Sequence, residues 1–359
     1  MRLAFCNATR SWGGVKTWTL EFASALKDLG HDVFIYGRAG AFIQRAESKG
    51  LPAEAVNFGP DFNPAAIRYF RRSFKERGIQ AVLVNVGRDL RTAGVAARLS
   101  GIPLVQRIGL PGDMRNTLYV RLIHSFLRPH YLFPCIFNRD GFLQNLPFVR
   151  SEHCTVVHSA KIPAPSICNS GHNSVSRPLR LVTTSQLNPD KGHEELLLLL
   201  GKLHKEGFEF TWDVAGTGRS AEQLKRLAED LGLGGRIHWH GFTQDVQAIL
   251  AQCDVFVLPS YSEGLPNTLL EAMALGLAPV ARNVGGIAEI WPEDLGDFLV
   301  PRLPRDGSML EPALRRVLGA SKEELLSWKL TAWKQCKTAF SMDSQAHKLE
   351  AFFQGLIEK

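Results

Sequence analysis

Two series of alternating strand-like and helix-like segments constrain the fold of this chain more than any other feature. The first series opens with an apolar strand over 2–6. A helix over 15–29 follows, with its apolar residues on one face, and then a strand over 32–36. The same series goes on with strands over 81–86, 103–108 and 154–158 and helices over 92–100 and 116–127. This order predicts a parallel sheet covered by helices.

A stretch rich in Pro, Ser, Asn and Gly interrupts the alternation at 161–180 and predicts a linker. The alternation then resumes, with strands over 179–184, 210–215, 237–240, 254–258 and 278–281 and helices over 194–205, 221–231, 246–253 and 267–275. We therefore predict an α/β protein with an N-terminal domain over 1–165, a linker over 166–178 and a C-terminal domain over 179–340. Ligands are expected in a cleft between the domains, beyond the carboxyl ends of the strands.

Composition excludes several other classes of protein. The 359 residues suit two domains, and no apolar run approaches the roughly 18 residues that cross a bilayer. The start of the chain has no signal-peptide layout, so we expect a cytoplasmic protein. The six cysteines form no C-x-x-C pair, which argues against a disulfide framework and a zinc site. We expect no metal and no cofactor.

Charge is distributed unevenly between the two halves. Residues 1–165 hold 22 Lys/Arg and 11 Asp/Glu, a formal charge of +11, and the remainder hold 20 and 24, a charge of −4. A basic half favours an anionic surface or substrate, although an ordinary solubilising surface explains it equally well.

Three short motifs lie where strands are expected to meet helices. Gly13 and Gly14 precede the first helix, where free N–H groups attract anions, but a tight turn is the alternative reading. Lys191 follows Gln186 in the loop after the strand over 179–184, where a cation suits a phosphate. Gly216 and Gly218 resemble part of a dinucleotide loop but lack its third glycine, so a dehydrogenase is not favoured.

The stretch 259–276 is the most informative motif. Glu263 lies in its loop, and Glu271 lies about one turn inside the following helix. Asn267 or Thr268 is expected to cap that helix, and the N–H groups there can hold a phosphate. Carboxylates accept hydrogen bonds from vicinal hydroxyls, so the two glutamates suit the sugar and ribose on either side of that phosphate.

Glu263 and Glu271, with seven residues between them, resemble the E-x7-E signature of retaining glycosyltransferases of family GT4, which have the GT-B fold. The segments LGHDV, NPDKG, AGTG, HGF, SEGLPNTLLEAMALG and NVGGIAEI extend the resemblance over nearly the whole chain. It implies two Rossmann-like domains facing a cleft and a last helix, over about 341–359, that completes the N-terminal domain. It also implies metal-independent transfer from a nucleotide sugar, with UDP the favoured nucleotide.

The resemblance also implies roles for individual residues. Glu263 would bind the donor sugar, Glu271 the ribose, and Lys191 the diphosphate. The nucleotide base would lie near His240 and Phe242. The remaining donor-binding residues would be Gly13, Gly14, Gln186, Gly216, Gly218, Gly264, Leu265, Pro266, Asn267 and Thr268.

Two departures from the family pattern concern catalysis. Gln186 stands where many relatives have Arg, so stabilisation of the leaving group falls more on Lys191. The segment over 104–108 lacks the His of many relatives and offers Arg107 instead, which could orient donor or acceptor.

The acceptor is expected to be a glycan or a lipid-linked molecule. Two basic, aromatic segments, over 68–77 and 115–128, could lie on an anionic inner membrane surface. The alternative is that both are ordinary helices packed on the sheet. No nucleic-acid module is present. A nucleotide-sugar epimerase and a catalytically weak nucleotide-sugar binding protein remain alternative functions.

Overall fold

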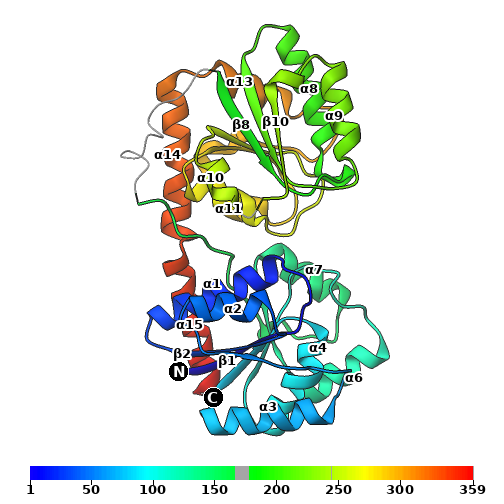
Figure 1. Ribbon diagram of the computed structural model, residues 1–359, viewed down its shortest axis with the longest axis vertical. Coiled ribbons are helices and arrows are strands. Elements are labelled where there is room, and N and C mark those ends of the chain that lie inside the picture. The colour runs from blue at the N-terminus through cyan, green and yellow to red at the C-terminus, as the bar shows by residue number, and fades with distance from the viewer. Residues whose placement is uncertain (166–177, 244, 359) are drawn as a thin grey trace. The chain divides into compact units, whose positions relative to one another are not determined.

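The computed structural model describes residues 1–165, 178–243 and 245–358, and these residues form two compact units. Unit 1 comprises Met1–Ser159 and Met342–Lys359, and unit 2 comprises Ala160–Ser341. The predicted linker over 166–178 lies almost entirely outside the described residues. Figure 1 colours the chain by residue number.

Unit 1 is built on a parallel sheet with the strand order β3-β2-β1-β4-β5-β6-β7. Its strands are β1 (Arg2–Asn7), β2 (Asp32–Gly37), β3 (Ala53–Ala55), β4 (Ala81–Val84), β5 (Leu104–Arg107), β6 (His130–Phe133) and β7 (Cys154–Val156). The central strands are buried along their length, because helices lie on both faces of the sheet (Figure 1).

The helices of unit 1 include one strongly basic helix, α3, and one that is unusually apolar on its outside, α6. The helical segments are α1 (Gly14–Asp28), α2 (Ala41–Ser48), α3 (Pro64–Arg77), α4 (Gly87–Asp89), a π-helical turn (Leu90–Gly94), α5 (Val95–Leu99), α6 (Leu118–Leu127), α7 (Ile136–Asn145), a 3-10 turn (Ser151–His153) and α15 (Met342–Ile357).

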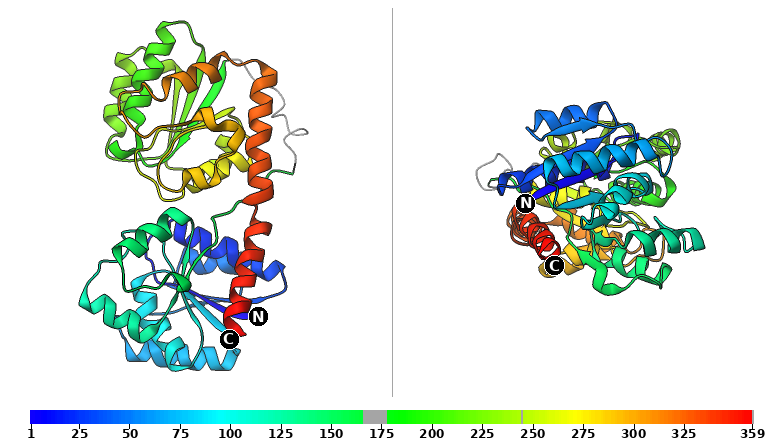
Figure 2. Two further views of the ribbon diagram at one scale, coloured as in Figure 1. Left: turned by 180° about the vertical axis from the view of Figure 1, so that it is seen from behind. Right: turned by 90° about the horizontal axis from the view of Figure 1, so that it is seen from below.

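The last helix, α15, packs on α1 and β4. Glu350 Oε1 on α15 lies 2.6 Å from His31 Nε2, within hydrogen-bonding distance. The N-terminus and the end of α15 therefore lie close together in both views (Figures 1 and 2).

Unit 2 contains a second parallel sheet, with the order β10-β9-β8-β11-β12-β13. Its strands are β8 (Leu179–Thr184), β9 (Phe210–Ala215), β10 (Ile237–Gly241), β11 (Val255–Leu258), β12 (Ala278–Arg282) and β13 (Leu299–Val300). Its α-helices are α8 (His193–Lys205), α9 (Ala221–Asp230), α10 (Val246–Leu250), α11 (Asn267–Ala274), α12 (Ile287–Ile290), α13 (Glu311–Gly319) and α14 (Lys322–Ala339). Short 3-10 turns cover Pro189–Lys191, Gly234–Arg236 and Glu293–Phe298.

Several predicted boundaries were wrong. The helix expected over 92–100 starts at Gly87, because the buried Asp89 carboxylate accepts the N–H groups of Asn85 and Val86 and so begins the helix earlier. The helix expected from 116 begins at Leu118, where Thr117 caps it by accepting the Val120 N–H. The strand expected to reach 158 ends at Val156.

Candidate active site

Lys191 and Glu263, which are far apart in the sequence, meet in unit 2. Strands β8 and β11 are parallel neighbours, so the loops that follow them leave the same edge of the sheet. Lys191 Nζ lies 2.8 Å from Glu263 Oε1 and donates to the Ser262 carbonyl at 3.2 Å. Both side chains are largely buried, which strengthens the ion pair.

A buried ionic cluster holds the segment 259–261, which precedes Glu263. The Glu195 carboxylate pairs with Arg282, which is fully buried, and accepts the Tyr261 hydroxyl. Arg282 Nε also donates to the Pro259 carbonyl at 3.1 Å. These residues hold both ends of the segment 259–261 and were missed by the sequence analysis, because an isolated Glu in a helix and an isolated Arg in a strand carry no local signal.

Glu271 lies one turn inside α11, as the signature predicts, and it is already paired. Lys161 Nζ lies 3.0 Å from Glu271 Oε1, and the Lys161 side chain is only 8% exposed. Lys161 was missed as a site residue, because a single lysine at the start of a predicted linker has no distinguishing pattern.

The expectation that Asn267 or Thr268 caps α11 was wrong. Pro266 occupies the N-cap position with no side-chain cap, and Asn267 is the first helical residue. The physical reason is that Pro266 fixes an extended conformation directly before the helix, which places Asn267 and Thr268 inside its first turn. The first N–H groups of a helix have no preceding turn to donate to, so those of Asn267 and Thr268 are candidate donors for an anion, whereas the Leu269 N–H donates to the Pro266 carbonyl at 3.2 Å.

The glycine motif after β9 packs backbone against backbone. A Cβ on Gly216 would lie 1.9 Å from the Ser185 carbonyl oxygen, and one on Gly218 would lie 2.4 Å from the Leu187 carbonyl oxygen. Gly216 also has a φ of +148°. The absence of side chains at these glycines therefore lets the loop after β9 pack closely on the loop after β8, which contains Gln186. The exposed Gln186 side chain accepts a hydrogen bond from Asn188 Nδ2 at 3.1 Å.

Gly285 makes a comparable close approach to the glutamate loop. It has a φ of +61°, and a Cβ there would lie 2.2 Å from the Glu263 carbonyl oxygen. The next residue, Gly286, donates its N–H to the Gly264 carbonyl at 2.7 Å. The double glycine of the NVGG segment is the sequence signal that could have found this support.

His240 lies at the end of β10 and is oriented by a buried acid. Its Nε2 is 2.7 Å from Asp213 Oδ1, and Asp213 is almost fully buried. Burial opposes ionisation of Asp213, but hydrogen bonds from His240 and Arg180 outweigh it and hold the pKa of Asp213 below its usual value. Phe242 is 76% exposed beside His240, so its ring is free to stack on a planar ligand.

Unit 1 contributes the other predicted residues. Gly13 caps α1 and Gly14 is its first residue, so α1 begins one residue earlier than expected. Arg107 ends β5 and is buried with its guanidinium 4.5 Å from the centre of the Trp18 ring. Burial lowers the pKa of Arg107 to about 10, so it stays cationic at neutral pH.

Arg107 lines a pocket of about 480 Å³ at the carboxyl ends of β4 and β5. Residues of the segments 85–91, 106–109 and 113–124 surround it, together with Val15 of α1. This is the edge of a parallel sheet at which ligands bind in open α/β folds.

The described residues contain no cluster of His, Cys, Asp and Glu that could hold a metal ion. In the same residues, no helix has both the length and the apolar character needed to cross a membrane.

Comparison with known proteins defines the class. Residues 13–131 match the family "Glycosyl transferase 4-like domain", and residues 170–318 match "Glycosyl transferases group 1". The chain therefore belongs to the GT4 group of glycosyltransferases with the GT-B fold, and the predicted pair of Rossmann-like parallel-sheet domains is confirmed.

The curated relatives are bacterial, and several are named for polysaccharide synthesis. The chain is 28% identical over 187 residues to the putative colanic acid biosynthesis glycosyltransferase WcaL of Escherichia coli, covering 50% of this chain and 46% of WcaL. It is 24% identical over 322 residues to the N,N'-diacetylbacillosaminyl-diphospho-undecaprenol alpha-1,3-N-acetylgalactosaminyltransferase of Campylobacter jejuni, covering 80% and 82% of the two chains. The chain thus spans less than half the length of WcaL.

Solved structures agree in fold. A glycosyltransferase from Rickettsia africae superimposes with a TM-score of 0.83 at 17% identity, covering 100% of this chain and 99% of that one. HepE of Anabaena in complex with UDP gives a TM-score of 0.80 at 19% identity, covering 99% and 100%.

Proposed function

We propose that this protein transfers a hexose-type sugar from a nucleoside diphosphate sugar to a glycan or lipid-linked acceptor, with retention of configuration. The reaction would serve cell-envelope polysaccharide or lipopolysaccharide synthesis on the cytoplasmic side of the membrane. The observation that carries the proposal is the 2.8 Å contact between Lys191 and Glu263, beside the helix that bears Glu271.

A nucleotide-sugar donor is supported from two directions. The Anabaena neighbour is described in complex with UDP and with UDP-glucose, which favours a uridine donor here. In this chain, Glu263 and Glu271 lie on either side of the first turn of α11, where N–H donors suit a phosphate. Glu271 would bind the ribose and Glu263 the transferred sugar.

The chemical difficulty is departure of the nucleoside diphosphate from the anomeric carbon. Negative charge grows on the phosphate oxygens as the bond breaks, and donors fixed around that charge are usually the largest catalytic contribution. An ammonium has three N–H donors, and Lys191 Nζ contacts Glu263 and Ser262 and lies 3.7 Å from Asp190 Oδ2, so a bound phosphate would replace the long contact with Asp190. Gln186 adds no charge, so Lys191 and the start of α11 would supply most of the stabilisation.

Retention follows if the acceptor attacks the face that the phosphate leaves. The acceptor oxygen bonds to the anomeric carbon, the carbon–phosphate oxygen bond breaks, and the acceptor proton passes to the departing phosphate. This scheme needs no protein base, which fits the cationic Arg107 in the place where many relatives have His. Arg107 would orient the acceptor in the pocket of unit 1.

Acceptor chemistry is supported by the relatives' names. The Campylobacter relative is named for a diphospho-undecaprenol acceptor, and WcaL for colanic acid synthesis. None of these names favours the epimerase alternative.

The first experiment is thermal shift against UDP-, GDP-, ADP- and dTDP-sugars, with the Glu271→Gln variant as control. A ligand that binds only the native state raises its melting temperature. Gln is preferable to Ala because it keeps the size of the side chain and an amide oxygen that can accept a hydrogen bond from Lys161. One sugar nucleotide should stabilise the wild type and lose most of its effect in the variant.

A transfer assay then tests the proposed acceptor and the retention of configuration. Incubation with the identified donor and lipid-linked glycans should give a product with the anomeric configuration of the donor. An inverted product would contradict the proposed mechanism, and stabilisation by no sugar nucleotide at millimolar concentration would contradict the proposed function.

A further inference from the structure

Helix α6 exposes an apolar face that the fold of unit 1 does not cover. Leu118, Tyr119, Leu122 and Phe126 are each more than half exposed, from 51% for Phe126 to 72% for Leu118. Their spacing puts them on one side of the helix, whereas Leu127 and His124 on the other side are buried. Four large neighbouring apolar side chains on one helix form a contiguous patch, which is typical of an interaction surface.

The helix is well defined, so this exposure does not result from fraying. Thr117 caps its start, and the buried His124 Nδ1 lies 2.8 Å from the Tyr131 hydroxyl on β6. At its end, the Phe126 carbonyl accepts from Arg98 Nε at 2.9 Å. Figure 1 places α6 at the outer side of unit 1, away from α1 and α2.

The surroundings of this face are cationic. The sequence from Met114 to Arg139 contains four arginines and no aspartate or glutamate. Arg115, Arg121 and Arg128 precede, accompany and follow the helix, and all three are exposed. An apolar face bordered by arginines complements the surface of an anionic bilayer, which offers acyl chains below a layer of negative charge.

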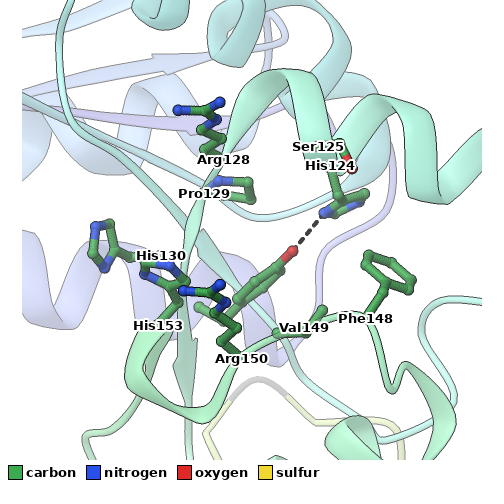
Figure 3. Close-up of a pocket in the computed structure, with 10 residues that line it drawn as sticks. His124, Ser125, Arg128, Pro129, His130, Phe148, Val149, Arg150 and His153 are labelled. Atoms are coloured by element: carbon green, nitrogen blue, oxygen red, sulfur yellow. Dashed lines mark hydrogen bonds between the residues drawn. The ribbon is translucent and has the colours of Figure 1, made fainter.

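A cationic pocket adjoins the end of α6. It has a volume of about 660 Å³, and Arg128, Arg150, His130 and His153 line it together with Ser125 of the helix (Figure 3). Arg150 pairs with Glu152 at 3.2 Å on the surface, a contact that a phosphate can readily replace. Such a pocket suits the phosphate of a lipid headgroup.

The other basic segment of unit 1 does not share these features. On α3, Phe70 and Phe74 are buried in the core, and Arg77 pairs with Glu54 at 2.6 Å. The outside of α3 is therefore charged without an apolar face, and the ordinary-helix interpretation holds there.

We infer that α6 lies on an anionic bilayer, with Leu118, Tyr119, Leu122 and Phe126 among the acyl chains and lipid phosphates in the pocket of Arg128 and Arg150. The inner side of α6 contributes Val120 and Ile123 to the pocket that contains Arg107. With α6 on the membrane, that pocket would lie near the bilayer surface, where a lipid-linked acceptor is presented. Only this role in acceptor binding rests on the proposed function.

The test is co-sedimentation of the full chain with vesicles of phosphatidylglycerol and phosphatidylcholine, and with phosphatidylcholine alone, at low salt. Wild type should bind the anionic vesicles, and Leu122→Glu with Phe126→Glu should reduce the bound fraction at least tenfold. Leu198→Glu, which changes a similarly exposed leucine on α8, is the matched control and should bind like wild type. Arg128→Glu with Arg150→Glu should remove the preference for anionic over neutral vesicles.

The inference would be overturned if the wild type did not bind anionic vesicles, or if Leu122→Glu with Phe126→Glu bound them as well as wild type. A concentration-dependent dimer that Leu122→Glu dissociates would also overturn it, because a second copy would then cover the face. The sugar-nucleotide thermal shift is measured on the same variants and should stay as in wild type. A wild type that a sugar nucleotide stabilises but that does not bind anionic vesicles contradicts only this inference. A wild type that binds the vesicles but that no sugar nucleotide stabilises contradicts only the proposed function.

Discussion

Lys161 Nζ and Glu271 Oε1 lie 3.0 Å apart, so the second glutamate of the signature pairs with a lysine near the start of unit 2. The backbone of Lys161 forms an isolated parallel β-bridge with Ser341. Lys161 is nearly buried, and its backbone N–H donates to the Phe340 carbonyl at 3.1 Å. The ammonium is therefore held on a rigid backbone and fixes the direction in which the Glu271 carboxylate points.

Lys161→Met should raise the KM for the donor roughly tenfold, a loss of about 1.4 kcal/mol in binding, and change kcat little. The reason is that Glu271 would no longer be oriented towards the ribose. Lys161→Arg should keep most of the affinity. Lys202→Met breaks a surface pair with Glu311 at 2.8 Å in the same unit and serves as the control. An unchanged KM in Lys161→Met would show that the pair has no positioning role.

Lys191→Met should lower kcat by about 10²–10³, the cost of removing one donor aimed at developing negative charge. Donor binding, measured by thermal shift, should weaken much less, because most of this contribution arises as the phosphate leaves. Steady-state kinetics with saturating donor measure the effect, and Lys225→Met on the surface is the control. A variant with weaker donor binding and an unchanged kcat would show that Lys191 only binds the donor.

Gly218→Ala should abolish most donor-induced stabilisation, since the new Cβ would lie 2.4 Å from the Leu187 carbonyl oxygen and push two loops apart. Gly235→Ala, where the Cβ meets nothing within 4 Å, should behave like wild type. Thermal shift with the identified sugar nucleotide compares them. Equal shifts in both variants would mean that the glycine loop does not shape the donor site.

Glu195→Ala should destabilise the protein by about 3–5 kcal/mol, because it leaves the fully buried Arg282 without its carboxylate. The neighbouring Glu194 is exposed, so Glu194→Ala should change the free energy of unfolding by about 0.5 kcal/mol or less. Urea unfolding provides both values. A difference below about 1 kcal/mol would contradict a structural role for the ionic cluster.

His193 should make the protein sensitive to mild acid. Burial, with a smaller contribution from Lys191, lowers the pKa of His193 to about 4, below its usual 6.5. The unfolded chain therefore binds a proton more readily, so stability falls as pH drops from about 6.5 towards 4. Between pH 7 and pH 5 this group should cost about 2 kcal/mol.

His193→Gln removes the titrating group and can keep the contact with Ser185 Oγ, which lies 3.1 Å from His193 Nε2. The variant should lose about 2 kcal/mol less than wild type over the same pH range, measured by urea unfolding. An identical loss in both proteins would assign the acid sensitivity to other groups.

Much of the fold could be predicted from local patterns. Apolar periodicity located the strands Leu179–Thr184 and Phe210–Ala215 without error, and the family resemblance implied a last helix close to the observed Met342–Ile357. Weaker signals were missed, including the strands Ala53–Ala55 and Leu299–Val300, because segments of two or three residues carry no periodicity. The cap of α11 was misplaced because Asn and Thr are common caps, while Pro266 fixed the backbone one residue earlier.

The two-domain α/β class, the glutamate signature and the place of each glycine loop could be predicted from local patterns, because these depend on residues that are neighbours in the chain. The folded structure was needed to show that Lys191 contacts Glu263, that Lys161 contacts Glu271 and that the buried Arg282 pairs with Glu195. It also decided that α6, rather than α3, presents an apolar face. Each of these depends on contacts between distant segments, and burial and pairing of a charge are fixed by the sheet that brings those segments together.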